Sequence, residues 1–386
     1  MTEEQLIGVP TLMRMAFDGD DMSAIGVALF QRINADTLDA NALLDAAWYL
    51  ILTGNLQQGL AVQEIAIQTR QLYHYPRPPA PASIKLLLVV GPGDLMANSP
   101  VEFLMEGQGV ALDLLYVTPE LGFPTDMPEH DVLMVGVAES DANQALLSYL
   151  SEALKDWPKP VLNPPGKIAE LSRDAVFAKL SHLPGVMIPA TCRVDRSALE
   201  HFAERYPIII RPIDSHAGEG LEKMDNQDAL QAYLAQSSED TFFISPFVDY
   251  TSRDGQYRKF RLMLIDGRAY VSHMAISARW MVHYLNSDML ERADYRQEEA
   301  DCMENFDATF ALRHQSALTE LSRRLGLDYV GIDCAETQDG QLLIFEVDSN
   351  MVVHNMDSAG MFPYKKVQMP KIFCAFSQLL ASNKRA

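Results

Sequence analysis

The sequence has few cysteines and no feature of a secreted or membrane protein. Its cysteines, Cys192, Cys302, Cys334 and Cys374, lie far apart and form no CxxC pair, which argues against a zinc site or a disulfide framework and favours free thiols. No apolar run is long enough to span a bilayer. The acidic start MTEEQLIGVP lacks a basic segment followed by an apolar one, so we expect no signal peptide and a cytoplasmic location.

Basic charge is also scarce. The chain has 31 Lys and Arg against 52 Asp and Glu, a net charge of -21. Phosphate backbones and anionic lipid surfaces attract basic proteins, so this charge argues against nucleic acid or a membrane as a general partner. A local basic pocket for a phosphate ligand stays compatible with it. With 386 residues, 48% of them apolar, the chain can form two or three domains.

Residues 1–75 show a helical pattern. Apolar residues such as Leu43, Ala47 and Leu50 recur at three- and four-residue spacing, and Gly54 supplies a helix stop and turn. The segment resembles one or two tetratricopeptide-type helical hairpins, and a generic helical cap fits nearly as well. Such a segment could present a peptide or protein partner.

Residues 76–83 are rich in proline, which favours an extended linker. Residues 84–165 then alternate strand and helix patterns, which predicts a small Rossmann-like parallel sheet. The first strand, 84–90, is followed by Gly91-Pro92-Gly93. Because this loop is not a GxGxxG fingerprint, it gives little support for dinucleotide binding.

An apolar strand over 206–212 carries Arg211 and is followed by a loop of small residues. The loop includes His216, Gly218 and Gly220. Its backbone N–H groups could approach phosphate oxygens while Arg211 neutralises their charge. A simple hairpin with a glycine turn explains the same residues.

A strand predicted over 257–265 carries Lys259 and Arg261 on one face and Arg258 on the other, because side chains alternate along a strand. Asp266-Gly267 follows as a hairpin turn. A solvated strand face would account for these cations equally well, since Lys and Arg are seldom buried.

Further along, a turn at Asp339-Gly340 joins two predicted strands and brings Asp333 beside Glu346. Glu346 and Asp348 project from the same face. Three carboxylates this close repel one another unless a cation lies among them. Since Mg²⁺ prefers oxygen ligands and nucleotide phosphates, the pattern predicts a magnesium site.

The order of these motifs, with an apolar strand at 242–248 between the first two, resembles the ATP-grasp superfamily, in particular glutathione synthetase-like and ribosomal protein S6 modification-type ligases. The resemblance covers about residues 84–375. It implies a fold of mixed α/β and α+β domains, in which an ATP-grasp domain at 166–386 closes two α+β subdomains on Mg-ATP.

The resemblance also implies roles for particular residues. The strand at 242–248 would read adenine, and because Pro246 has no N–H, a neighbour such as Phe247 would donate to the base. Asp249 or Asp254 would meet the ribose, and the sequence does not choose between them. The residues implied in ATP binding are Arg211, His216, Gly218, Gly220, Ser245, Phe247 and Lys259, and those implied in metal binding are Asp333, Glu346 and Asp348.

The sequence departs from the family pattern at several positions. Arg211 stands where the family usually has lysine. Asp348 replaces the asparagine of Glu-x-Asn, so either Asp348 or Asn350 is the third metal ligand. The usual lysine of a preceding helix corresponds to Ala175, and Arg173 or Lys179 could substitute for it.

Residues 277–286 lie where the family binds its acceptor substrate. Arg261 would contact phosphate, Arg279 would hold a carboxylate or acyl-phosphate oxygen, and His283 would act as a base toward an amine. A structural role for His283 is about equally plausible. Asn286, Asn350 and His354 are further candidates for substrate binding.

The implied reaction is an ATP- and Mg-dependent carboxylate–amine ligation, less often with a thiol, through an acyl phosphate. A rival hypothesis is a degenerate ATP-grasp adaptor that uses its helical segment and has no turnover. A kinase that stops at the phosphorylated product would need no acceptor pocket. The sequence identifies neither the carboxylate nor the nucleophile, and it leaves a homo-oligomer open.

Overall fold

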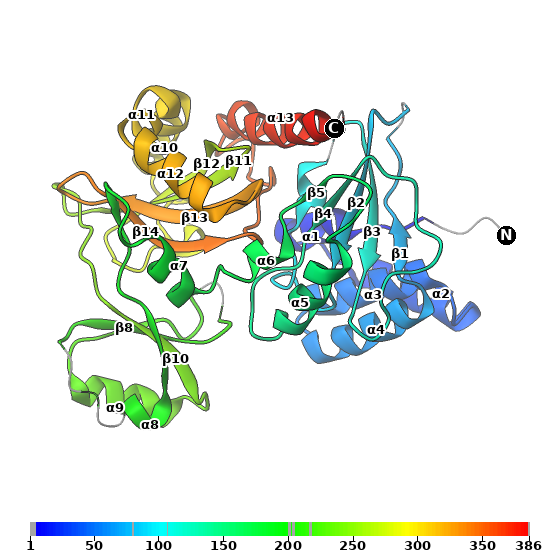
Figure 1. Cartoon of the computed structure of the whole chain (residues 1–386), viewed down its shortest axis with the longest axis horizontal. Helices are drawn as coiled ribbons and strands as arrows, with labels where there is room; N and C mark the ends of the chain where they lie inside the picture. The colour runs from blue at the N-terminus through cyan, green and yellow to red at the C-terminus, as the bar shows by residue number, and fades with distance from the viewer. Residues whose placement is uncertain are drawn as a thin grey trace. The chain divides into compact units, whose positions relative to one another are not determined.

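The computed structural model describes residues 5–78, 81–105, 107–199, 202, 205–215 and 218–384. The chain divides into two compact units. The first unit comprises Met1–Ala138, Ala142–Ile168 and Ser349–Ala386, and the second comprises Glu139–Asp141 and Ala169–Asp348. Both contain helices and strands (Figure 1), which confirms the predicted multidomain α/β class. Among the described helices, none has the length and apolar character needed to cross a membrane.

The first unit begins with helices, as the apolar spacing predicts. They are α1 (Val9–Asp18), α2 (Ser23–Ala35), α3 (Ala40–Leu52) and α4 (Leu56–Thr69). The carboxylate of Asp39 caps α3 by accepting the N–H of Ala42 at 2.9 Å. Gly54 turns the chain between α3 and α4 at a φ of 85°. The tetratricopeptide resemblance of these helices stays a prediction.

The end of this segment is a strand, which corrects the prediction of helical structure through residue 75. β1 (Leu72–His74) pairs antiparallel with β3 (Val110–Tyr116), with Tyr73 opposite Leu114. The reason is that the edge of β3 presents backbone groups that need hydrogen-bond partners. The helical segment therefore leads directly into the sheet of the first unit.

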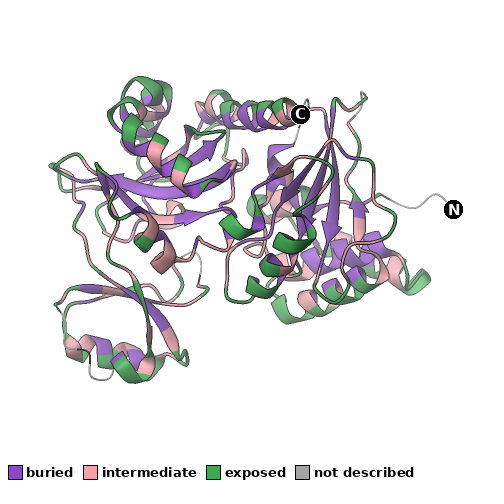
Figure 2. Cartoon of the chain, viewed as in Figure 1, coloured by how far each residue is buried: buried purple, intermediate pink, exposed green. Residues whose placement is uncertain are grey.

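The parallel sheet predicted for residues 84–165 is confirmed. Its strand order is β1-β3-β2-β4-β5, with β2 (Ile84–Val90), β4 (Val132–Val135) and β5 (Val161–Leu162) running parallel to β3. β2, β3 and β4 are buried along most of their length (Figure 2), as expected for apolar strands of a parallel sheet. The unit also contains η1 (Val101–Leu104), α5 (Gln144–Ala153), α6 (Pro165–Ile168) and α13 (Lys365–Asn383).

The loop after β2 is held from two sides within the first unit. Gln63 of α4 donates to the carbonyl oxygen of Gly93 at 2.9 Å and accepts the N–H of Gly93 at 2.7 Å. Further along the loop, Ser99 donates its hydroxyl to the carbonyl of Ser349 at 2.6 Å. Residues 349–384, which the sequence places in the ATP-grasp domain, thus pack with the first unit.

A buried carboxylate lies where α1 begins. Asp45 of α3 is fully buried and accepts the N–H groups of Ile7 at 2.7 Å and Gly8 at 3.0 Å. Burial raises the pKa of Asp45 to about 6, although these two hydrogen bonds favour the charged form. An ordinary aspartate in an unfolded chain has a pKa of about 3.9.

We therefore expect the free energy of unfolding to contain a contribution from Asp45 that is fully present below about pH 4 and is lost as the pH rises through about 6. Two pKa units correspond to about 2–3 kcal/mol. Urea unfolding from pH 4 to 7 should show this slope in the wild type and a flatter profile in Asp45→Asn. Asp20→Asn removes an exposed carboxylate and controls for net charge. Equal slopes in Asp45→Asn and the wild type would contradict the assignment.

The second unit contains two sheets with helices against them. One sheet is antiparallel, in the order β7-β10-β8-β9, with strands β7 (Cys192–Asp195), β8 (Ile208–Pro212), β9 (Glu222–Met224) and β10 (Thr241–Pro246). Apolar side chains of β8 and β10 share a core with those of α8 (Arg196–Leu199) and α9 (Gln227–Gln236).

The other sheet has the order β12-β11-β13-β14-β6 and is antiparallel except for β6. Its strands are β6 (Val186–Met187), β11 (Tyr257–Ile265), β12 (Arg268–Ser277), β13 (Tyr329–Glu336) and β14 (Leu342–Asp348). Its helices are α7 (Arg173–Leu180), η2 (Tyr284–Asn286), α10 (Ala293–Asn305), η3 (Phe306–Ala308), α11 (Phe310–Arg313) and α12 (Gln315–Leu325). Asp266 and Gly267 have φ values of 49° and 77°, which confirms the predicted hairpin turn between β11 and β12.

Candidate active site

Three neighbouring strands of the β12-β11-β13-β14-β6 sheet place charged residues in one row. In β11, Arg261 is opposite Asp333 of β13, and Asp333 is in turn opposite Glu346 of β14. The strands adjoin in Figure 1. The predicted juxtaposition of Asp333 and Glu346 is confirmed, and the row extends to Arg261.

Asp333 is bound by two cations. Its Oδ1 accepts from Nε of Arg261 at 2.9 Å, and its Oδ2 lies 2.7 Å from Nζ of Lys259. Burial alone would raise the pKa of Asp333, but the charges of Arg261 and Lys259 outweigh it and hold this pKa well below its usual range. Asp333, which is only 1% exposed, is therefore ionised at neutral pH.

The alternation predicted for β11 is confirmed. Lys259 and Arg261 share Asp333 on one face, whereas Arg258 lies on the other and pairs with Asp254 at 2.7 Å and Glu298 at 2.5 Å. This pair with Arg258 lowers the pKa of Asp254 to about 2. Of the two candidates for the ribose, Asp254 is thus already engaged by an arginine.

Glu346 faces arginines from two other elements. Arg173 of α7 forms an ion pair with Glu346 and donates to the carbonyl oxygen of Phe345 at 3.2 Å. Burial would raise the pKa of Glu346, but Arg173 and Arg211 lower it. Lys179 pairs instead with Glu170 at 2.5 Å. Of the two residues that could replace the family lysine, Arg173 is the one that reaches the carboxylates.

Arg211 lies at the end of β8, 8% exposed, where its Nε donates to the hydroxyl of Ser215 at 3.0 Å. Burial lowers the pKa of Arg211 to about 10, with a further contribution from Arg173, while Glu346 and Asp348 oppose the shift. Arg211 thus interacts electrostatically with Glu346 and Asp348, the two carboxylates of β14. It remains charged at neutral pH.

The glycines after Arg211 are required by the backbone. Gly218 and Gly220 have φ values of 81° and 62°. A Cβ on Gly220 would lie 2.7 Å from Cδ of Pro212. The backbone of this loop therefore favours glycine at both positions. His216, predicted to contact phosphate, lies outside the described residues.

The charges of this cluster do not cancel. The cations Arg173, Arg211, Lys259 and Arg261 outnumber the carboxylates Asp333, Glu346 and Asp348 by one. The chain as a whole carries -21. The cluster is thus a local positive site, whose charge suits an anionic ligand.

The cations beside these carboxylates are protein side chains, so the carboxylates do not by themselves require a metal. Asp333 and Glu346 are neutralised by arginine and lysine side chains. Within the described part of the chain, no three acidic, histidine or cysteine residues are grouped as ligands of a metal ion. The carboxylates therefore do not fit a bare cation. They fit a metal that arrives with phosphates, because the phosphates would take over the arginines and the lysine.

The strand predicted to read adenine differs from expectation at Phe247. Its N–H donates to the carbonyl oxygen of Pro207 at 3.0 Å, because the pairing of β10 with β8 continues past Pro246. That N–H is therefore already used in this structure, and its role as donor to the base stays a prediction. Ser245 lies opposite Ile209 in the same pairing. The ring of Phe247 contacts Lys223, whose Nζ is 4.7 Å from the ring centroid.

The structure brings Arg279, His283 and Asn286 together in one turn. Oδ1 of Asn286 accepts the N–H of His283, and Nη2 of Arg279 donates to the carbonyl of Asn286, both at 2.9 Å. Burial lowers the pKa of His283, and the charges of Lys259 and Arg261 lower it further. His283 therefore lies within electrostatic reach of the cluster as a neutral imidazole, while Asn286 shapes the turn.

Sequence reasoning missed Glu299, which supports this turn from α10. The carboxylate of Glu299 is fully buried and accepts the N–H of Met274 at 3.0 Å and the hydroxyl of Tyr284 at 3.3 Å. Nothing in the local sequence distinguishes Glu299 from its neighbour Glu298, which pairs with Arg258.

The last two substrate candidates lie in the first unit. The side-chain amide of Asn350 donates to the carbonyl oxygen of Met96. The ring of His354 lies 5.7 Å from that of Phe17, and its Nδ1 accepts the N–H of Met356 at 3.2 Å. The roles of Asn350 and His354 in substrate binding stay predictions.

No known family profile and no curated protein sequence matches the chain. Solved structures do. The D-alanine–D-alanine ligase of Bacillus anthracis complexed with ATP is 10% identical, with a TM-score of 0.48 over 78% of this chain and 97% of that chain. The ATP-grasp ligase PsnB, complexed with precursor peptide PsnA2 and AMPPNP, is 15% identical, with a TM-score of 0.46 over 78% and 98%. A RimK domain protein ATP-grasp of Sphaerobacter thermophilus DSM 20745 is 15% identical, with a TM-score of 0.43 over 77% and 99%.

Proposed function

We propose that the chain is an ATP-grasp enzyme that uses Mg-ATP to join a carboxylate to an amine. The observation that carries the proposal is the row Arg261–Asp333–Glu346, enclosed by Lys259, Arg173 and Arg211. It combines carboxylates that suit Mg²⁺ with an excess of cations that suits phosphates.

In this proposal Asp333, Glu346 and Asp348 hold the metal, and the arginines and Lys259 hold the phosphates. Without nucleotide, the cations pair with the carboxylates. Binding of Mg-ATP exchanges these partners, so no buried charge is left unpaired. Held by these carboxylates, the metal would supply positive charge that offsets the charge of the phosphates. Arg261 and Arg211 offset the charge on the phosphoryl group as it moves.

The proposed chemistry has two steps. An oxygen of the substrate carboxylate attacks the terminal phosphorus of ATP, and the bond to ADP breaks. The amine nitrogen then attacks the acyl carbon, the bond between that carbon and the phosphate oxygen breaks, phosphate leaves with the bonding electrons, and His283 accepts the proton of the amine. Arg279 is proposed to hold an oxygen of the carboxylate or of the acyl phosphate. A thiol acceptor would follow the same path.

The assignment of His283 as base predicts the acidic limb of the pH profile. A base must be neutral, and the pKa of His283 is lowered by burial and by Lys259 and Arg261. We expect kcat/KM to fall on acidification with a midpoint below about 6.5. Lys259→Met removes one of these charges and should move the midpoint to higher pH, whereas Arg258→Met, on the opposite face of β11, should not. An unmoved midpoint in Lys259→Met would exclude His283 as the base.

The proposed ligase activity is tested by trapping the acyl phosphate. The full chain is incubated with ATP, Mg²⁺, a panel of small and peptide carboxylates and hydroxylamine, which converts an acyl phosphate into a stable hydroxamate. We expect ADP and hydroxamate in equal amounts with the correct acid. If the chain bound ATP but released no ADP with any acid in the panel, the result would instead favour a degenerate adaptor. ADP and a phosphorylated product that hydroxylamine does not trap would favour a kinase.

A further inference from the structure

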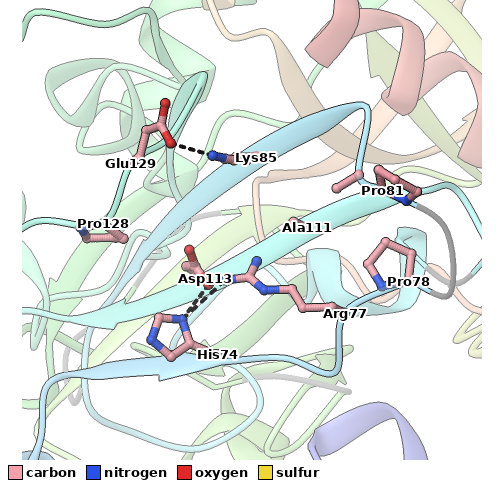
Figure 3. A pocket seen from close by; sticks show the side chains of 10 residues that line it. His74, Arg77, Pro78, Pro81, Lys85, Ala111, Asp113, Pro128 and Glu129 are labelled. Carbon is pink, nitrogen blue, oxygen red and sulfur yellow. Dashed lines mark hydrogen bonds and ion pairs between the residues drawn. The ribbon is translucent and has the colours of Figure 1, made fainter.

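A cavity of about 590 Å³ lies in the first unit, which does not contain the candidate active site. Its charged lining comes from β1, the following loop, β2, β3 and the segment before β4 (Figure 3), and consists of His74, Arg77, Lys85, Asp113 and Glu129. Lys85 and Ala111 are the second residues of the parallel strands β2 and β3. The cavity therefore lies toward the amino ends of these strands, away from the loop that follows β2.

The floor of the cavity is a buried carboxylate. Asp113 is the one charged residue of β3 and is 3% exposed. A carboxylate in an apolar strand is costly unless it has partners. Its Oδ1 lies 2.7 Å from Nδ1 of His74 and 2.6 Å from Nη2 of Arg77, and both side chains converge on it in Figure 3. Asp113 thus fixes an imidazole and a guanidinium at the edge of the cavity.

A second cation lies on the other side of the cavity. Nζ of Lys85 is 2.5 Å from Oε2 of Glu129. A dashed line marks this ion pair in Figure 3. The side chains of Lys85 and Glu129 are 44% and 86% exposed, and such exposed pairs contribute little. Lys85 can therefore turn from Glu129 toward a ligand, whereas Arg77 is held by Asp113.

The rest of the lining is apolar and compact. It consists of Pro78, Pro81, Ala82, Ala111 and Pro128. Prolines have no N–H to donate and little freedom to move, so the side-chain hydrogen-bond donors left for a ligand are those of Arg77 and Lys85.

We propose that this cavity binds a small anion, a carboxylate or phosphate on a compact apolar body, through Arg77 and Lys85. Its acidic groups do not favour a cationic ligand, because Asp113 already binds two partners and Glu129 extends into solvent. A guanidinium fixed by a buried carboxylate is well oriented for a planar anion. The site is separate from the proposed ligase site and does not depend on it.

The test is calorimetric titration of the full chain with benzoate and, separately, with inorganic phosphate. We expect saturable binding of at least one anion to the wild type. Arg77→Ala and Lys85→Ala should each weaken it about tenfold or more, while Lys155→Ala, an exposed lysine of the same unit, should not. Circular dichroism checks that each variant folds, and Lys85→Ala tests the site without disturbing Asp113. Binding of benzoate alone would identify a carboxylate on an apolar body, and binding of phosphate alone would identify a phosphate group.

Absence of binding of both anions to the wild type would overturn the proposal, as would binding that Arg77→Ala and Lys85→Ala leave unchanged. Glu346→Gln separates this site from the ligase site. It should keep the wild-type affinity for the anion, because Glu346 lies in the other unit. A loss of anion binding in Glu346→Gln would contradict the assignment to the cavity.

Discussion

Glu346→Gln is expected to lower ATP turnover by at least about 100-fold, the usual cost of removing one group that stabilises a charged transition state. Glu346 is a proposed metal ligand, and it also pairs with Arg173 and is influenced by Arg211. Glutamine keeps the shape of the side chain but removes its charge, so it binds Mg²⁺ poorly. The measurement is ADP release with the acid identified by trapping, at saturating ATP and Mg²⁺.

Glu336→Gln provides a matched control. Glu336 ends β13 and pairs with Arg313 at 2.6 Å, so its replacement also removes one glutamate–arginine pair. Because it is opposite Leu342 at the other end of the hairpin, it should retain wild-type turnover. Equal rates in Glu346→Gln and the wild type would rule out a metal role for Glu346.

Arg261→Met should lower both stability and turnover. It leaves Asp333, 1% exposed, with Lys259 as its remaining cation. Removing one partner of a buried ion pair typically costs about 3–5 kcal/mol, and we expect the lower end because Lys259 stays. Turnover should fall about 100-fold or more, because Arg261 no longer offsets charge on the phosphoryl group. Chemical denaturation and ADP release measure the two effects.

Two further variants separate stability from chemistry. Arg258→Met lies on the opposite face of β11 and loses only partly exposed partners, so it should cost less than about 1 kcal/mol and keep its turnover. Adding both Asp333→Asn and Lys259→Met to Arg261→Met leaves none of these three positions charged and should recover part of the stability, but no activity. If turnover returned together with stability, Arg261 would have only a structural role.

The strand-borne part of the site follows from local rules. Alternation along β11 places Lys259 and Arg261 together, and a turn places Asp333 opposite Glu346. Side chains alternate along a strand with a period of two, and a short turn sets which residues of a hairpin are opposite each other. These neighbours therefore depend little on the rest of the chain. The prediction of a local basic site in an acidic chain rests on the same residues.

Contacts between distant segments could not be predicted in this way. Arg173 and Lys179 were equal candidates in the sequence, and the packing of α7 against β14 brings Arg173 to Glu346. At Phe247 the deciding partner is Pro207, forty residues earlier, whose carbonyl takes the N–H expected to bind adenine. Glu299 is distinguished from Glu298 only by its partners in the folded chain, Met274 and Tyr284, whereas Glu298 pairs with Arg258.

The most direct test of the proposed site is calorimetric titration of the wild-type chain with ATP in the presence and absence of Mg²⁺. The arginines and Lys259 predict binding of the phosphates, and the carboxylates predict that Mg²⁺ strengthens it. We expect micromolar affinity with Mg²⁺ and at least about tenfold weaker binding without it. No binding of ATP under either condition, or an affinity that Mg²⁺ leaves unchanged, would contradict the assignment of this cluster as a Mg-ATP site.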